Sequence, residues 1–318
     1  MAPNLILKHL VSLVALKHLQ INVFTDTQAI LLLGSLSSLI TLSLELSFGS
    51  VWTDDADPRL VAPVELRRLR DLTLVCSTMS WHTIQEMATR LKMPALESLS
   101  LHTAISYFVG SLPALSALIH NRPHLCSLHI TINKDNYSFL YVPVRLSEIL
   151  KTLFPLHTLD DLKVVIDPRR PRVPLSSEDL REAAAAWPHL RRLELYTIVH
   201  KLVDSEVPPE NAGVGIDILA HFARSCPRLE VLTLYPSVLD VGSLANAESV
   251  ESDDAEQEGC MAQDTLRELK LGGFIIVRDP EADALLKNVR RYASKLFPSA
   301  HVDLKCTVED DRLREAFP

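Results

Sequence analysis

Four side chains that could bind a metal ion fall within one short stretch, HNRPHLCSLH. His120, His124, Cys126 and His129 carry the imidazole and thiol groups that zinc prefers. In the repeat register described below, His120 ends a helix, His124 follows a proline and His129 faces one side of a strand. Because these side chains diverge, we expect ordinary repeat positions here and no metal site.

Motifs that would indicate catalysis are missing from the chain. It contains no HExxH, no GxSxG, no phosphate-binding P-loop and no paired carboxylates at a useful spacing. The glycines of AGVGID, Gly213 and Gly215, lack the third glycine of a dinucleotide-binding motif and follow PPEN rather than a strand, which favours a plain loop. Cys226 stands beside Pro227, in a position typical of a buried small side chain rather than a nucleophile. We expect no catalytic residues, no cofactor and no enzymatic activity.

The charge of the chain argues against nucleic-acid binding. The formal net charge is -8, and the segment 248–264 alone carries seven acids and no Lys or Arg. The remainder is therefore -8 minus -7, or -1, which lacks the basic surface that releases counterions from nucleic acid. We expect residues 245–264 to be a disordered, solvated insertion, with a docking tail for a basic partner as the alternative.

Cysteine usage and the N-terminal residues indicate the compartment. The five cysteines are scattered, odd in number and without a CxxC pair, which is typical of reduced thiols. Lys8, His9, Lys17 and His18 bracket the first apolar stretch too closely for a secretory signal. The uncharged run from Thr27 to Leu44 contains Gln28 and several serines, so we expect no membrane span. A cytoplasmic or nuclear protein is expected.

A repeated pattern organises nearly the whole chain. The segment LEVLTL at 229–234 has the form LxxLxL, and related segments begin at 16, 39, 69, 96, 125, 159, 190, 266 and 299. Their spacing of 23 to 39 residues suits one strand and one helix per unit. The segments upstream of several strands have helical spacing, such as Ile84, Met87, Ala88 and Leu91, and Ser176 with Asp179 is a plausible helix cap. Prolines two residues before the motif, such as Pro94 and Pro227, are expected to end each helix.

These units predict an α/β leucine-rich-repeat solenoid, a horseshoe of about ten strand–helix repeats, as a single domain over residues 1–318. Right-handed crossovers place the strands in parallel on the concave face and the helices on the convex face. The leucines of LxxLxL point into the core, and the alternate residues point onto the concave face.

The concave face is where we expect a protein or peptide partner. Val165, Tyr196 and Tyr235 fall on three consecutive strands, and adjacent exposed aromatic side chains are typical anchors of interfaces. The alternative is that a neighbouring loop, 167–174 or 204–215, covers the tyrosines. The expected partner-binding residues are Val165, Tyr196, Tyr235, Lys163, Arg192, Glu194, His129 and His102.

The unit AHFARSCPRLEVLTL, with MATRLKMPALESLSL and REAAAAWPHLRRLEL, resembles the leucine-rich repeats of F-box proteins, most closely those of fungi. The resemblance implies the substrate-recognition arm of a cullin-RING ubiquitin ligase. No F-box helices precede the first repeat, so a cullin adaptor is expected as a partner only if an upstream F-box exists. The alternative is a free-standing leucine-rich-repeat binding or inhibitor protein with no link to ubiquitin.

Overall fold

In the computed structural model the chain forms two compact units, Met1–Val144 and Arg145–Pro318. The residues that the structure describes are 14–24, 33–46, 63–76, 84, 88–104, 112–120, 122–133, 146–166, 175–197, 214–235, 238–240, 262–275 and 282–308.

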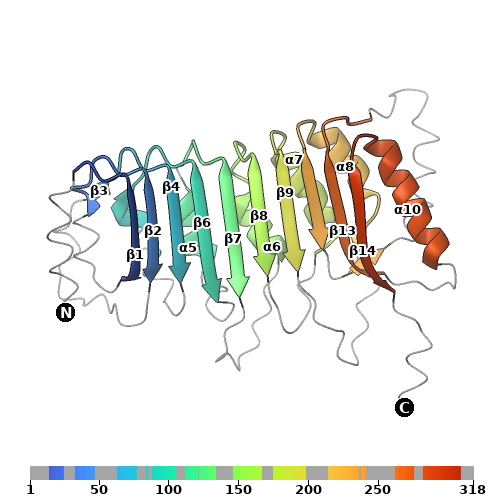
Figure 1. Ribbon diagram of the computed structural model, residues 1–318, viewed down its shortest axis with the longest axis horizontal. Coiled ribbons are helices and arrows are strands. Elements are labelled where there is room, and N and C mark those ends of the chain that lie inside the picture. Colours follow the sequence, from blue (N-terminus) through green and yellow to red (C-terminus); the bar gives the residue numbers. More distant parts are fainter. Residues whose placement is uncertain are drawn as a thin grey trace, which may run out of the picture. The chain divides into compact units, whose positions relative to one another are not determined.

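The first unit is built on a parallel sheet. Its strands pair in the order β1-β2-β4-β6-β7, which is also their order in the sequence (Figure 1). Helix α5 (Leu112–Ile119) precedes the last of these strands. A separate two-stranded parallel sheet pairs β3 (Val64–Glu65) with β5 (Leu91–Lys92). The five long strands are β1 (His18–Phe24), β2 (Thr41–Leu46), β4 (Asp71–Cys76), β6 (Ser98–Ala104) and β7 (Ser127–Asn133).

The second unit repeats the design of parallel strands and helices. Its strands β8, β9, β11, β13 and β14 pair in parallel in this order, and each described helix precedes one of them. The short strands β10 (Val214–Gly215) and β12 (Val238–Asp240) continue the sheet beside β13. The main strands are β8 (Asp161–Ile166), β9 (Arg192–Thr197), β11 (Val231–Tyr235), β13 (Glu268–Ile275) and β14 (His301–Val308). The helices are α6 (Leu146–Leu153), α7 (Ser177–Ala186), α8 (Ile218–Ser225) and α10 (Ala282–Leu296).

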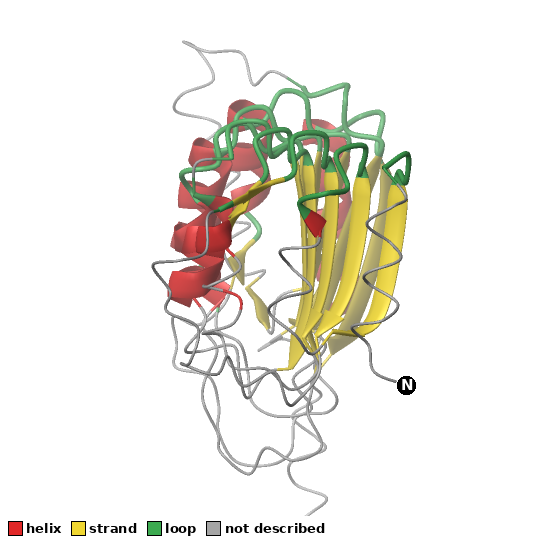
Figure 2. Ribbon diagram, turned by 90° about the vertical axis from the view of Figure 1, so that its left-hand side faces the viewer, coloured by secondary structure: helices red, strands yellow, loops and turns green. Residues whose placement is uncertain are grey.

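Every long strand starts two residues after the first position of its LxxLxL segment. Strand β4 starts at Asp71 after Leu69, and β11 starts at Val231 after Leu229. In all of these repeats but the first and the last, the first leucine of the motif is buried just before the strand. The next two apolar residues are buried and alternate with more exposed ones, as Leu72 and Leu74 do in β4. The leucines therefore fill one side of each sheet, and the helices of each unit lie on that side of its own strands (Figure 2).

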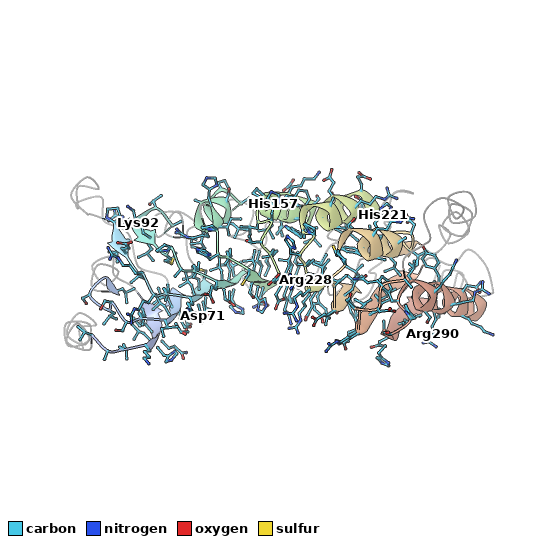
Figure 3. All side chains as sticks on the ribbon, turned by 90° about the horizontal axis from the view of Figure 1, so that it is seen from above. Asp71, Lys92, His157, His221, Arg228 and Arg290 are labelled. Atoms are coloured by element: carbon cyan, nitrogen blue, oxygen red, sulfur yellow. The ribbon has the colours of Figure 1, made fainter. Side chains whose placement is uncertain are left out.

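The helix before β11 ends just before its proline, as the sequence pattern predicts. Helix α8 ends at Ser225, and the chain passes through Cys226, Pro227 and Arg228 to reach β11. Figure 3 marks the two sides of this joint, His221 on α8 and Arg228 in the turn. Cys226 is buried, and its thiol lies 3.5 Å from the carbonyl oxygens of Ala184 and Trp187 in the preceding repeat. The buried cysteine thus fills the space between successive joints.

Helix α7 begins with the expected cap. The Asp179 backbone N–H donates to the Ser176 hydroxyl (3.2 Å), and the Ser176 N–H donates to the Asp179 carboxylate (3.1 Å). At the other end, buried Trp187 donates its indole N–H to the Leu153 carbonyl (3.4 Å) and packs edge-on against Phe154. These contacts tie α7 to the end of α6.

The structure differs from the sequence pattern in places. Leu91, expected at the end of a helix, lies instead in strand β5. Val214 and Gly215, expected in a plain loop, form strand β10. Residues 245–261 of the expected insertion lie outside the described residues, whereas Gln263 is buried and donates to the Cys226 carbonyl (2.6 Å).

Each unit therefore has the α/β leucine-rich-repeat fold, with one strand per repeat and an apolar side that carries the helices. The residues between the leucines form the opposite side, which we call the polar face. Among the described residues, no helix is long and apolar enough to cross a membrane.

Candidate functional site

The polar face of the second unit brings six of the eight expected binding residues together. The strand register places Val165, Tyr196 and Tyr235 side by side on β8, β9 and β11. In the adjacent row, Lys163 on β8 stands opposite Glu194 on β9. Both rows follow from the alternation of side chains along strands that start at equivalent motif positions.

Tyr196 and Tyr235 form an aromatic stack on this face. Their ring centroids are 5.2 Å apart, and their planes differ by 26°. The Lys163 ammonium lies 5.7 Å from the Tyr196 ring centroid, within the range of a cation–π interaction. Stacked rings gain about 0.5–1.5 kcal/mol beyond the area that they bury. The two rings therefore hold each other in place before any partner binds, so binding costs little side-chain entropy.

Gly272 lies beneath the ring of Tyr235. It follows Leu271, which pairs with Leu234, so Gly272 is the neighbour of Tyr235 on β13. A Cβ atom at Gly272 would overlap Cδ1 and Cε1 of the Tyr235 ring. Glycine inside a strand is a signal of such a close approach. The repeat register places Gly272 next to Tyr235, and the structure shows that the ring lies over it.

Charged groups surround the stack. The Lys163 ammonium lies 3.0 Å from the Glu194 carboxylate, and the Arg192 Nε lies 3.9 Å from the other Glu194 oxygen. Arg192 also reaches Asp161 at 3.8 Å. On β13, Lys270 pairs with Glu268 at 2.7 Å, an ion pair that the sequence pattern did not single out.

We call the side chains of Lys163, Arg192, Glu194, Tyr196, Tyr235 and Lys270 the tyrosine patch. Thr233 lies in the row between Glu194 and Lys270 and is only 1% exposed, although it points to the polar face. Thr73, its counterpart on β4 of the first unit, is half-buried. The patch is thus a packed cluster of side chains above the sheet.

Burial changes the titration of one tyrosine. It raises the pKa of the Tyr196 hydroxyl above its ordinary value, and the negative charge of Glu194 raises it further. Lys163 opposes this shift. The Tyr196 hydroxyl is therefore neutral at physiological pH, and it forms hydrogen bonds with the Glu194 and Thr233 side chains.

The other two expected residues, His102 on β6 and His129 on β7, lie on the polar face of the first unit. The register pairs His129 with Ser100 and His102 with Thr131, so the two histidines occupy adjacent rows. Burial lowers the pKa of His102, and the charge of His129 lowers it further. Around them the face consists mainly of Ser and Thr side chains, and we treat it as a separate surface.

The residues with metal-binding side chains do not converge. His120 follows the end of α5, His124 lies in the turn, and His129 lies on the polar face of β7. The Cys126 thiol donates to the Glu97 carbonyl at 3.4 Å. Across the described ranges, no group of three His, Cys, Asp or Glu side chains could hold a metal ion. Two loops, 167–174 and 204–215, were expected as possible covers of the tyrosines. Residues 167–174 and 204–213 lie outside the described residues, and Val214 and Gly215 form β10.

Comparisons with known proteins are sparse at the level of sequence. No protein-family model matches the chain, and no curated protein matches it. Twenty-eight chains of solved structures match. One is in the crystal structure of a TLR13–ssRNA13 complex, with 15% sequence identity and a TM-score of 0.36; the match covers 95% of this chain and 44% of that chain.

Proposed function

We propose that this protein is a non-enzymatic scaffold that binds a protein or peptide partner through the tyrosine patch. The observation that carries the proposal is the stack of Tyr196 on Tyr235, set on the polar face and surrounded by charged side chains. Aromatic and arginine side chains dominate the binding energy of protein interfaces, and a rigid pair loses little entropy when it binds. The proposal involves no cofactor, nucleic acid or membrane.

Affinity capture tests this proposal. The tagged chain is purified from its own cells alongside the double variants Tyr196→Ala/Tyr235→Ala and Tyr196→Phe/Tyr235→Phe. The alanine pair removes both rings, whereas the phenylalanine pair keeps the stack and serves as the matched control. We expect a partner that is retained by the native and phenylalanine forms and lost from the alanine form. An identical set of captured proteins in all three forms, with folding intact by circular dichroism, refutes this function.

A finer proposal is that the scaffold serves as the substrate arm of an F-box-type ubiquitin ligase in the cytoplasm or nucleus. It is supported by the resemblance of the unit AHFARSCPRLEVLTL and its relatives to F-box repeats. The alternative is a free-standing scaffold. The same capture, repeated with any longer product of the gene, separates them: cullin adaptor subunits are expected with the ligase arm. One stable partner without ligase subunits in either form indicates the free-standing scaffold.

A further inference from the structure

The outer face of helix α10 carries a cluster of positive charges. Val289, Tyr292 and Leu296 are buried on its inner side. The sequence between 284 and 302 contains no Asp or Glu, whereas α6 and α7 each carry charges of both signs. We call the exposed basic residues of α10 the basic face, and they are Lys287, Arg290, Arg291 and Lys295.

The positive charges of the basic face are close together and only partly compensated. The span from Lys287 to Lys295 is eight residues of helix, or roughly 12 Å. No ion pair joins Lys287 or Arg290 to another residue of the described part of the chain. Like charges four residues apart on a helix, such as Lys287 and Arg291, destabilise it. Carboxylates placed over the basic face would relieve this repulsion.

The most acidic stretch of the chain is attached beside one end of this helix. Residues 248–258, which we call the acidic segment, contain six Asp or Glu and no Lys or Arg. Just after it, the Gln263 backbone N–H donates to the Leu296 carbonyl at 2.9 Å. The buried Gln263 side chain also donates to the Cys226 carbonyl at 2.6 Å, which fixes the position of this residue. The acidic segment therefore leads into the C-terminal end of α10, next to Lys295.

The length of chain between Gln263 and the acids allows them to reach the whole basic face. Glu258 and Glu251 precede Gln263 by five and twelve residues, so an extended chain reaches up to roughly 17 Å and 40 Å from it. Lys287, the far end of the basic face, is roughly 14 Å along the helix from Leu296. A short tether also gives the acids an effective concentration on the order of millimolar, which favours them over a free acidic partner.

We propose that the acidic segment binds the basic face of α10 within the same molecule. Its carboxylates pair with the ammonium and guanidinium groups along the outer side of the helix. The acidic insertion thus has its basic partner in its own chain, and an external acidic protein reaches the basic face only by displacing it. This inference goes beyond the proposed function, because it does not involve the tyrosine patch.

Zero-length crosslinking of the purified full chain tests the contact. A carbodiimide joins a lysine amine to a carboxylate that lies against it, and mass spectrometry of the digest identifies both residues. We expect Lys287 and Lys295 to be joined to acids of the segment 248–258. Lys151 is the control, because it lies 3.7 Å from Glu182 and should be joined to that residue and not to the acidic segment.

The pattern of crosslinks decides between the possible occupants of the basic face. Isotopically labelled and unlabelled chains are mixed before the reaction, so that links within one molecule are distinguished from links between two. Links between two molecules assign the basic face to a second copy and overturn the proposal. Links from Lys287 and Lys295 only to Asp279, Glu281 or Asp283, or no links from them while Lys151 reacts, overturn it as well.

A charge variant then measures the strength of the contact. A protease that cleaves after glutamate cuts the acidic segment more slowly when the segment is bound. We expect Arg290→Gln to speed this cleavage about two- to fivefold at low salt, as for the loss of one exposed ion pair, and high salt to remove the difference. The matched control is Lys151→Gln, which removes an exposed lysine from α6. Equal rates for the native chain and Arg290→Gln at low salt contradict the contact.

Discussion

The ring of Tyr235 lies directly over the backbone of Gly272 on the neighbouring strand, at a distance that leaves no room for a Cβ atom. This contact lets Tyr235 lie against the sheet while its ring stacks on Tyr196. Gly272 therefore helps to position the tyrosine patch, although it contributes no side chain to it.

Substituting Gly272 should disturb the stack without unfolding the chain. We expect Gly272→Ala to displace the Tyr235 ring, because a methyl group would overlap two of its carbons. The readout is the ring resonances of Tyr196 and Tyr235 in NMR spectra, together with binding of the captured partner. In a Tyr235→Ala background the same methyl group has nothing to meet. The Tyr196 resonances can be compared in both backgrounds, and a Gly272→Ala shift of these resonances that is equally large in both shows that the contact with the Tyr235 ring is not its cause.

Because the pKa of Tyr196 is raised in the folded protein, part of the free energy of unfolding is lost at alkaline pH. A tyrosine whose pKa is higher in the folded state binds its proton more tightly there, so the contribution is complete below the unfolded pKa. It is lost as pH rises through the folded pKa. We expect Tyr196→Phe to flatten the fall in unfolding free energy above about pH 10. Urea unfolding curves at several pH values measure this free energy for the native protein and for Tyr196→Phe. If it falls in parallel for both proteins, Tyr196 is not the source of the loss.

His102 should titrate below an ordinary histidine. Burial lowers the pKa of His102 first, and the charge of His129 lowers it further. The contribution of His102 to the free energy of unfolding is therefore complete above the pKa of the unfolded state and is lost as pH falls through the pKa of the folded state. We expect His129→Gln to raise the pKa of His102, as followed by its imidazole resonance in an NMR titration. His124→Gln, which changes an exposed histidine in the turn, is the control. If the pKa of His102 is the same in the native protein and in both variants, the charge of His129 does not affect His102.

Two cysteines should be inert in the folded protein. Burial raises the pKa of the Cys76 and Cys226 thiols to about 12, so almost no thiolate forms at neutral pH. We expect iodoacetamide at pH 8 to leave both unmodified until urea unfolds the chain. Peptide mapping by mass spectrometry measures each site. Modification of Cys226 at the same rate in native and unfolded protein contradicts its buried position in the joint.

The cap of α7 should contribute measurably to stability. Ser176→Ala removes the hydroxyl that accepts from the Asp179 N–H, and it should cost about 1 kcal/mol in unfolding free energy. Urea unfolding monitored by circular dichroism measures the loss. Ser299→Ala, in an exposed turn, is the matched control and should change little. Equal midpoints for both variants contradict a stabilising cap.

The repeat pattern predicted the local structure well because each signal acts over a few residues. The LxxLxL segments predicted every long strand with a constant offset, since alternating leucines have one side to bury. Ser176 and Asp179 predicted the start of α7, since a cap depends only on residues within one turn. The prediction failed at Leu91, where pairing with β3 draws the chain into a strand.

The patch itself was predicted only in part. The sequence placed Val165, Tyr196 and Tyr235 in one row, and the register confirms that row. Whether they bind a partner stays a prediction. The sequence did not identify the contacts of Gly272 and Lys270, because these depend on how the Tyr235 ring lies over β13 and on the side-chain conformations of Lys270 and Glu268 within that strand.

The sequence by itself determined the repeat, the strands and the side of each strand that is buried, because these depend on short-range spacing and on the alternation of side chains. Only the tertiary structure decided that the Tyr235 ring lies over Gly272, that Thr233 is buried on the polar face, and that Glu194 lies deeper than Lys163. Such relationships depend on how side chains from neighbouring strands pack together, and that packing cannot be predicted from the spacing of residues along one strand.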